Sequence, residues 1–310
     1  MNKGSWSGDA EASSSSLPPL PPPPPLSPSI LRHMDSSDLE GDLISSLDRR
    51  KMYREVTLSI RSGIRDATSE TSFLRVRGLQ VLLKALQSIS KNDTTIGLFH
   101  QSQSIPQLQV VPVLFQHTLK QNVEEPIFDI DHILGVEPKK ICSPATEKEV
   151  AIGLRVLQGC CLLHEESKFF ANQYSAIKVI INLLSTRGIL EQGACLDVLV
   201  SLMLDSPSNQ LEFEACRGLD VVAQLIKDDQ KDEDIRLKCG EFLLLLIGHV
   251  NGREMAPLAT IHDDIQQLLG EKCASLIWAA SQFGSTLNPD ERQIALQIQT
   301  RRVLEAIEFY

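Results

Sequence analysis

Apolar residues recur with a fixed period through the middle of the chain. Between Ala151 and Gly248 one pattern is written three times, and its first two copies are offset by 42 residues. In the third copy Cys239, Phe242 and Leu245 continue the first half of the pattern 43 residues further on. A helical period of about 40–47 residues is typical of armadillo or HEAT repeats, whose units bury their apolar faces against their neighbours. The aligned pairs are Leu154/Leu196, Val156/Val198, Leu157/Leu199, Gly159/Ser201, Ile177/Leu219, Val179/Val221, Ile180/Val222, Leu183/Leu225 and Leu184/Ile226.

Apolar spacing and turn residues predict the individual helices of this array. Thr146 followed by Glu149 is a capping box that opens the first of them. We expect Asn209, or one of the serines in the run Asp205–Asn209, to cap a short helix. Gly218 is expected to make the sharp turn into the next helix, because glycine allows a positive φ and a close helix crossing. The expected helices span 147–163, 168–173, 176–185, 190–204, 209–216, 219–227, 234–248, 261–269 and 273–280.

A final helix is predicted within 286–310, where Pro289 provides the first residue. We expect it to cap the end of the array, because terminal repeats need a polar outer face. Docking elsewhere is the alternative. The residues that fall on one side of this helix are Leu296, Thr300, Val303, Ile307 and Tyr310.

The N-terminal segment 1–40 is rich in serine and proline and contains the run from Leu17 to Leu26, LPPLPPPPPL. Proline fixes φ and removes backbone donors, so we expect a disordered or polyproline II tail. Such a run can dock on an aromatic groove of the SH3, WW, EVH1 or profilin type. A solvated tail without a partner is the alternative.

The helical domain is expected over 41–285. Leu43, Ile44 and Leu47 begin an amphipathic helix near Asp42, which continues or is closely followed by a second. The segment 73–89 is another helix, and 91–145 is an insertion or loop with a short helix at 110–119. Basic residues concentrate early in this domain, and they form either a face for an acidic partner or a solvated surface. They are Arg49, Arg50, Lys51, Arg54, Arg61 and Arg65.

Composition narrows the class of protein. Of the residues, 42% are hydrophobic and 5% are aromatic, and helical repeats fill their interfaces mainly with aliphatic side chains. The net charge of −10 argues against a general nucleic-acid binder, which needs cations to neutralise phosphates. We read the seven cysteines as reduced apolar residues of a cytoplasmic protein, with the nucleus or a membrane surface as alternatives. No apolar run is long enough for an integral membrane segment.

The sequence offers little catalytic chemistry, and we name no catalytic, cofactor-binding or metal-ligating residue. His117 and His132, near Asp129 and Asp131, form the only loose cluster, and their spacing is irregular for a metal site. His164 ends a helix, where an imidazolium suits the negative end of the dipole. No phosphate-binding, dinucleotide-binding, zinc-protease or serine-hydrolase motif occurs, so we expect a protein that is not an enzyme and takes no cofactor.

Three runs carry a resemblance to a known family. They are Leu157–Phe170 (LQGCCLLHEESKFF), Asp205–Leu219 (DSPSNQLEFEACRGL) and Asp234–Leu243 (DIRLKCGEFL). They resemble the septation-initiation-network component family of cell division control protein 14 type, which is armadillo-like and unrelated to the phosphatase of similar name. The resemblance covers about 147–248 and the helices over 43–89, but neither the proline tail nor 91–145. Proline tails are common in plant proteins, so a plant relative is expected.

The resemblance implies an all-α, right-handed armadillo/HEAT-like solenoid of about four to five units. It also implies a scaffold or regulatory subunit for a Ste20-like protein kinase in cytokinesis, and no catalytic residues to carry over. The shared Asn209, Phe213 and Gly218 are architectural. The hypothesis is therefore a non-catalytic interaction protein in cell-division or growth signalling. The alternative is a peripheral adaptor that modulates a membrane transporter or growth-control complex.

Overall fold

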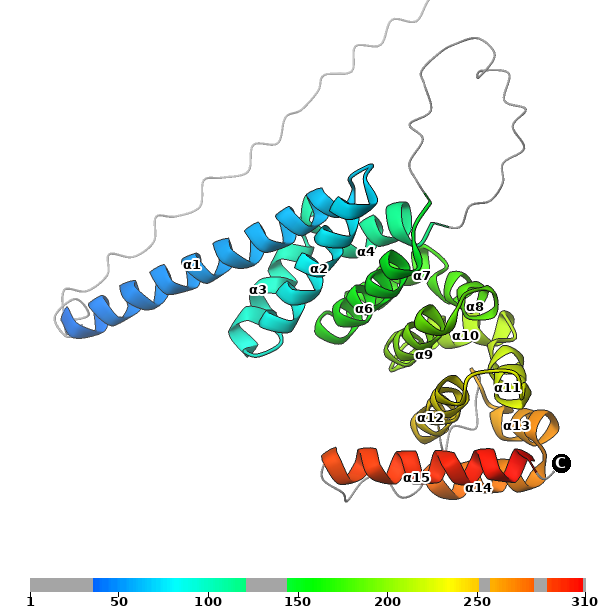
Figure 1. Cartoon of the computed structure of the whole chain (residues 1–310). Coiled ribbons are helices and arrows are strands. Elements are labelled where there is room, and N and C mark those ends of the chain that lie inside the picture. The colour runs from blue at the N-terminus through cyan, green and yellow to red at the C-terminus, as the bar shows by residue number, and fades with distance from the viewer. Residues whose placement is uncertain (1–35, 121–143, 251–256, 282–288, 309–310) are drawn as a thin grey trace, which may run out of the picture. The chain divides into compact units, whose positions relative to one another are not determined.

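The computed structural model describes residues 36–120, 144–250, 257–281 and 289–308, and these residues are all-α, without a strand (Figure 1). The predicted fold class is thereby confirmed. Contacts divide the chain into two units, 1–48 and 49–310, which we describe separately. In the first unit the described part is the beginning of α1 (Ser36–Ala67), with Ile44 and Leu47 exposed. The proline run lies outside the described residues.

The second unit contains the rest of α1 and all later helices. They are α2 (Ser72–Ile89), α3 (Asp93–Gln103), η2 (Pro106–Leu108), α4 (Val110–Val113), η3 (Leu114–Thr118), α6 (Glu147–Leu163), α7 (Glu166–Gln173), α8 (Ala176–Thr186), α9 (Ile189–Met203), α10 (Pro207–Ala215), α11 (Gly218–Lys227), α12 (Glu233–Val250), α13 (Ile261–Leu269), α14 (Glu271–Ser281) and α15 (Pro289–Glu308).

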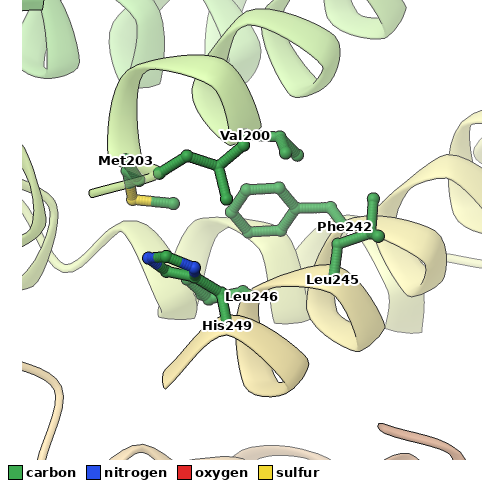
Figure 2. Close-up of a pocket in the computed structure, with 7 residues that line it drawn as sticks. Val200, Met203, Phe242, Leu245, Leu246 and His249 are labelled. Atoms are coloured by element: carbon green, nitrogen blue, oxygen red, sulfur yellow. The ribbon is translucent and has the colours of Figure 1, made fainter. Parts of the chain in front are cut away.

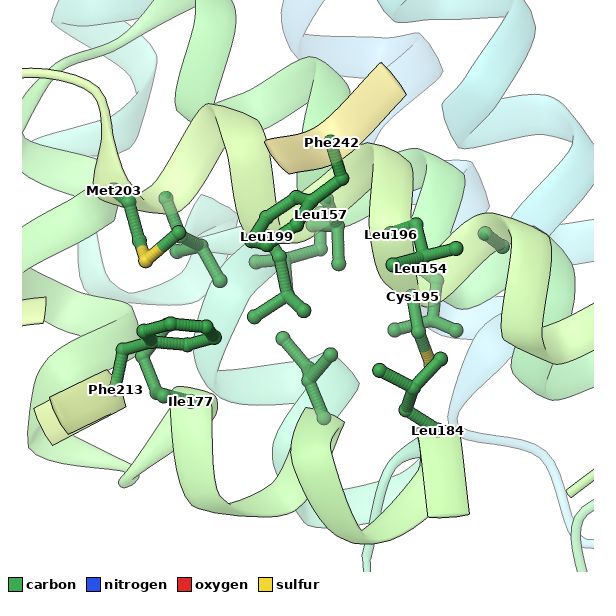
Figure 3. Packing of buried hydrophobic residues seen from close by; sticks show 14 of the residues in the cluster. Leu154, Leu157, Ile177, Leu184, Cys195, Leu196, Leu199, Met203, Phe213 and Phe242 are labelled. Atoms are coloured by element: carbon green, nitrogen blue, oxygen red, sulfur yellow. The ribbon is translucent and has the colours of Figure 1, made fainter. Parts of the chain in front are cut away.

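Four of these helices pack in series. α2 packs on α6, α6 on α9 and α9 on α12, while α8 and α11 back α9 and α12 respectively. The repeated apolar residues fill the space between them, as Leu154, Leu196 and Leu199 do in Figure 3. Serial packing of this kind is what the 42-residue period predicts. The right-handed sense of the solenoid and its number of units stay predictions.

Local sequence signals account for the helix ends. The Thr146 hydroxyl accepts a hydrogen bond from the Glu149 amide at 3.3 Å, and the Glu149 carboxylate accepts one from the Thr146 amide at 2.8 Å. The predicted capping box is therefore confirmed. Pro207 and Pro289 each occupy the first position of a helix, where a missing N–H is tolerated.

Two predictions about the second repeat are confirmed only in part. The left-handed residue before α11 is Arg217, with φ of 53°, and not Gly218. Gly218 is needed for space, because a Cβ there would overlap the ring of Phe213. Asn209 does not cap α10 but lies inside it, fully buried, and donates to the Leu202 carbonyl at 2.9 Å. The Asn209 Oδ1 also accepts a hydrogen bond from Asn172 Nδ2 at 3.1 Å, so the buried amide has partners for both its nitrogen and its oxygen. Of the serines, Ser206 occupies the N-cap position of α10, without a side-chain hydrogen bond to the helix.

The third copy of the pattern also differs from its prediction. Leu245 was aligned with Leu202, which is fully buried, but 46% of Leu245 is exposed on α12. At this position α12 therefore turns towards solvent a side chain that the 43-residue offset predicts to be buried. Cys239 and Phe242 are buried as expected.

The first part of the region assigned to an insertion is helical and contributes to the core. α3, η2, α4 and η3 occupy 93–118, and Phe99, Leu108 and Leu114 are almost fully buried. Residues 121–143 lie outside the described ranges. The short helix predicted at 110–119 is confirmed as α4 and η3. The sequence obscured α3 and η2, because they are short and Pro106 interrupts the apolar spacing, which weakens the period-3.6 signal.

Candidate partner-binding face

The outward side of α2, α6, α9 and α12 forms one continuous surface, which we call the ladder face. It is defined by seven residues: Leu83 and Gln87 of α2, Arg155 and Leu162 of α6, Asp197 of α9, and Lys238 and Leu245 of α12. Four consecutive helices of the series thus each contribute side chains to it. No part of it depends on residues outside the described ranges.

A groove of about 420 Å³ lies at the α2–α6 end of the ladder face. Leu83, Leu86 and Leu162 provide apolar walls, whereas Gln87 and Arg155 provide polar ones. Gly159 lets the two helices approach, because a Cβ there would lie 3.0 Å from Cδ1 of Leu86. The groove has the size and mixed lining that suit one or two side chains of a bound peptide.

Two groups at this groove lack the partners that a purely structural role would give them. Leu162 is 62% exposed near the C-terminal end of α6. Arg155 is exposed and makes no ion pair or hydrogen bond with any of the described residues. An exposed leucine beside an available guanidinium is the combination that a protein partner can use, with apolar contact and a carboxylate or phosphate.

Charges of both signs continue the face across α9 and α12. The Lys238 ammonium donates to both carboxylate oxygens of Asp197, at 2.8 and 2.9 Å. Glu241 lies one turn further along α12. Burial raises the pKa of the Glu241 carboxyl, Lys238 lowers it in part, and Asp197 raises it again. The pair is half-exposed, so its contribution is to position charge more than to stabilise the fold.

The boundary between α9 and α12 is a narrow apolar slot of about 10 Å³ (Figure 2). Val200 and Met203 face Phe242 and Leu245 across it. At its end the His249 Nε2 accepts a hydrogen bond from the Asp205 amide at 3.2 Å. A slot of this size holds no organic ligand, so this half of the face offers a surface and not a pocket.

The five buried cysteines of the described residues are poor nucleophiles. Cys160, Cys161, Cys195, Cys239 and Cys273 are buried thiols. Burial raises the pKa of Cys161, against a smaller opposing effect of Lys168, and that of Cys239, in both cases to about 12. These thiols therefore stay protonated near neutral pH and behave as small apolar residues.

Of the two histidines singled out as a loose cluster in the sequence, His117 lies on η3, apart from the ladder face. Burial lowers the pKa of His117, with Lys120 and Arg75 adding to the effect, while His132, Asp129 and Asp131 lie outside the described residues. Within the described ranges no three His, Cys, Asp or Glu side chains gather as metal ligands.

His164 does occupy the C-cap of α6, but the expected charged role was wrong. Burial, and then His100, lower its pKa, against an opposing effect of Glu166. The neutral ring instead makes a 2.9 Å hydrogen bond between Nδ1 and Ser167 Oγ and an edge contact with His100.

No helix in the described part of the chain is long and apolar enough to cross a membrane. The basic side chains of α1 stand on its surface: Arg50, Lys51, Arg54 and Arg61 are exposed, and Arg65 pairs with Asp66 at 3.3 Å. The ladder face itself was missed by sequence reasoning. A leucine or arginine on a helix shows its exposure only when the neighbouring helices are placed.

Comparisons with known proteins identify a family and a fold. No curated protein sequence matches the chain significantly. Two crystal structures, each titled as an engineered protein, align with the chain. The first has 13% sequence identity and a TM-score of 0.50, and the match covers 91% of this chain and 97% of that one. The second has 14% identity, a TM-score of 0.40, and coverage of 80% and 96%. The first likeness concerns the fold alone.

A family model agrees with the resemblance seen in the sequence. It matches residues 115–263, which include α6 to α12 and therefore most of the ladder face. This family is not the phosphatase family of similar name, and its description as a SIN component indicates a role in cell-division signalling. Residues 115–263, just under half of the chain, match the model of the family described as cell division control protein 14, SIN component.

Proposed function

We propose that the protein is a non-catalytic scaffold or regulatory subunit in cell-division signalling, and that it binds a protein partner through the ladder face. The observation that carries this proposal is the exposed Leu162 beside Arg155 at the mouth of the α2–α6 groove. A partner segment with an apolar residue next to a carboxylate or phosphate fits both groups.

A Ste20-like protein kinase is the proposed partner, because the family resemblance implies one. Kinases carry exposed acidic and phosphorylated segments, which suit Arg155. The cytoplasm is the proposed site of action. The interaction needs no chemistry from this chain, since its role is to hold the kinase in place.

Affinity purification of the full chain from its source cell, with protein kinases quantified by mass spectrometry, tests the proposal. We expect a kinase to co-purify with the wild type and to be lost with the variant Arg155→Glu/Leu162→Ser. Leu211→Ser is the matched control, because Leu211 is about equally exposed but lies on α10, away from the ladder face. Equal recovery with all three proteins would place the binding elsewhere, and recovery of no kinase would remove the kinase from the proposal.

The exposed cations of α1 favour a second candidate function, as a peripheral adaptor at an anionic membrane surface. Lys51, Arg54 and Arg61 are spaced so that they share one side of the helix. Flotation with vesicles containing phosphatidylserine tests this directly. Binding that falls with rising salt and with the triple change of these residues to glutamine supports it, and absence of binding at low salt excludes it.

A further inference from the structure

The helix α15 is anchored firmly by its inner side. Thr300 is fully buried against α12, where a Cβ on Gly240 would lie 2.6 Å from Cγ2 of Thr300. On the same side the thiol of Cys273 on α14 lies 3.7 Å from the Val303 carbonyl oxygen. Because these contacts leave α15 little freedom to rotate, they determine which of its residues face outward.

The outer side of α15 is more apolar than the end of a repeat array should be. Ile294 is 58% exposed and Ile298 is 48% exposed. A helix that closes an array needs a polar outer surface, and an exposed pair of β-branched residues one turn apart is a departure from that rule. The departure indicates a surface that is covered in the working protein.

Charged residues flank the two isoleucines in a heptad-like order. Positions 291, 294, 298, 301 and 305 are separated by three and four residues alternately, which places them in one stripe along the helix. The stripe reads Glu, Ile, Ile, Arg, Glu, and all five residues are partly or fully exposed. Apolar residues in the middle with opposite charges at either side are typical of a helix–helix interface.

The stripe is complementary to itself when it is reversed. Ile294 and Ile298 lie at equal distances from position 296, and so do Glu291 and Arg301. In an antiparallel pair of α15 helices, Ile294 of one copy therefore meets Ile298 of the other, and Glu291 meets Arg301. This is the self-matching required of a two-fold interface, in which the same patch serves both subunits.

We propose that α15 pairs in antiparallel fashion with α15 of a second copy of this chain, forming a homodimer around Ile294 and Ile298. A single helix pair buries less surface than a permanent dimer, so the association is weak and depends on concentration. The charge order selects a second copy over an unrelated apolar peptide, because only the reversed copy supplies both salt bridges. The inference is independent of the ladder face and of the kinase.

Sedimentation equilibrium of the full chain over a series of concentrations tests the dimer. We expect the wild type to move from monomer toward dimer as the concentration rises. Ile294→Ser/Ile298→Ser should remain monomeric with unchanged helical circular dichroism, because both side chains are outward. The control Leu162→Ser/Leu245→Ser, on the ladder face, should dimerise like the wild type.

A charge-swap experiment distinguishes the proposed antiparallel pairing from non-specific hydrophobic association. Glu291→Arg places two arginines on the stripe and Arg301→Glu places an additional glutamate there, so each variant alone should dimerise at least tenfold more weakly. An equimolar mixture of the two restores both opposite-charge pairs and should form a mixed dimer. The proposal is overturned by a wild type that is monomeric at every concentration, by serine variants that still dimerise, or by a mixture that associates no better than its components.

Discussion

The first two repeats share a backbone plan but fill it with different side chains. Ser175 before α8 and Arg217 before α11 are 42 residues apart, and both are left-handed, with φ of 49° and 53°. At the equivalent positions nearby, the first repeat has Ala171 and Ala176, whereas the second has Phe213 and Gly218. A ring has been gained at one position and a methyl group lost at another, because the space between the helices is fixed.

The polar positions of the two repeats diverge more than the apolar ones. Glu149 and Glu191 are equivalent and both are buried, but only Glu149 has a charged partner, with 3.2 Å between its Oε2 and Nη2 of Arg75. Neither carboxylate oxygen of Glu191 has a hydrogen-bond partner among the described residues. The two repeats therefore share their apolar packing, whereas the partners of their charged residues differ.

Substitutions of Phe213 and Gly218, the two positions at which side-chain volume differs between the repeats, should have the largest effects on stability. Phe213→Ala is expected to lower the free energy of unfolding by about 3–5 kcal/mol through the cavity it leaves. Gly218→Ala alone should lower it by about 1–3 kcal/mol, because the methyl group overlaps the ring. The double variant Phe213→Ala/Gly218→Ala has the two alanines of the first repeat at these positions. Its loss of unfolding free energy should be smaller than the sum of the losses of the two single variants. Denaturation in urea measures all three, and strict additivity would contradict the exchange.

The two buried glutamates should respond oppositely to the same change. Glu149→Gln leaves the Arg75 guanidinium without its carboxylate and is expected to cost about 3 kcal/mol, at the low end for a broken buried pair. The effect is limited because Arg75 still donates to the Glu70 carbonyl at 2.7 Å. Glu191→Gln removes an uncompensated buried carboxylate and should be neutral or stabilising. Thermal unfolding of both variants side by side is the measurement, and a large loss with Glu191→Gln would reveal a partner for that group.

His164 distinguishes the repeats by their response to acid, since Ser206 occupies its place in the second. Because burial lowers the pKa of His164 in the fold, the unfolded chain takes up the proton first as the pH falls. Stability should therefore decline as the pH drops through the unfolded value of about 6.5. His164→Ser should flatten this decline between about pH 7 and pH 5. Unfolding midpoints measured across that interval check the prediction, and parallel curves for the two proteins would refute it.

The smallest expected effect concerns the ladder face. Asp197 is equivalent to Arg155, so Asp197→Arg gives the second repeat the residue that the first has at this position. The change brings an arginine beside Lys238 and should cost a few tenths to about 1 kcal/mol, because the pair is half-exposed. The loss should shrink in high salt. A salt-independent loss would mean that packing, and not charge, is responsible.

The periodic helices were predictable from local patterns in the chain. Apolar spacing located α6 to α12 to within a few residues, and the capping box at Thr146 and Glu149 was readable because both partners lie within one turn. The family was also recognisable from runs inside this region. These features depend on neighbours in the sequence, which is why they could be read directly.

The candidate site and several roles depended on contacts between distant residues. Arg75 and Glu149, or Gly218 and Phe213, acquire their meaning from the way in which helices approach each other. The exposure of Leu162 and Ile294 likewise depends on what packs beside them. A helical period specifies which side of a helix is apolar, but several helices here are apolar on more than one side. Only the placement of neighbouring helices determines which of those sides stays open to a partner, because burial is a property of the assembled surface and not of the residue.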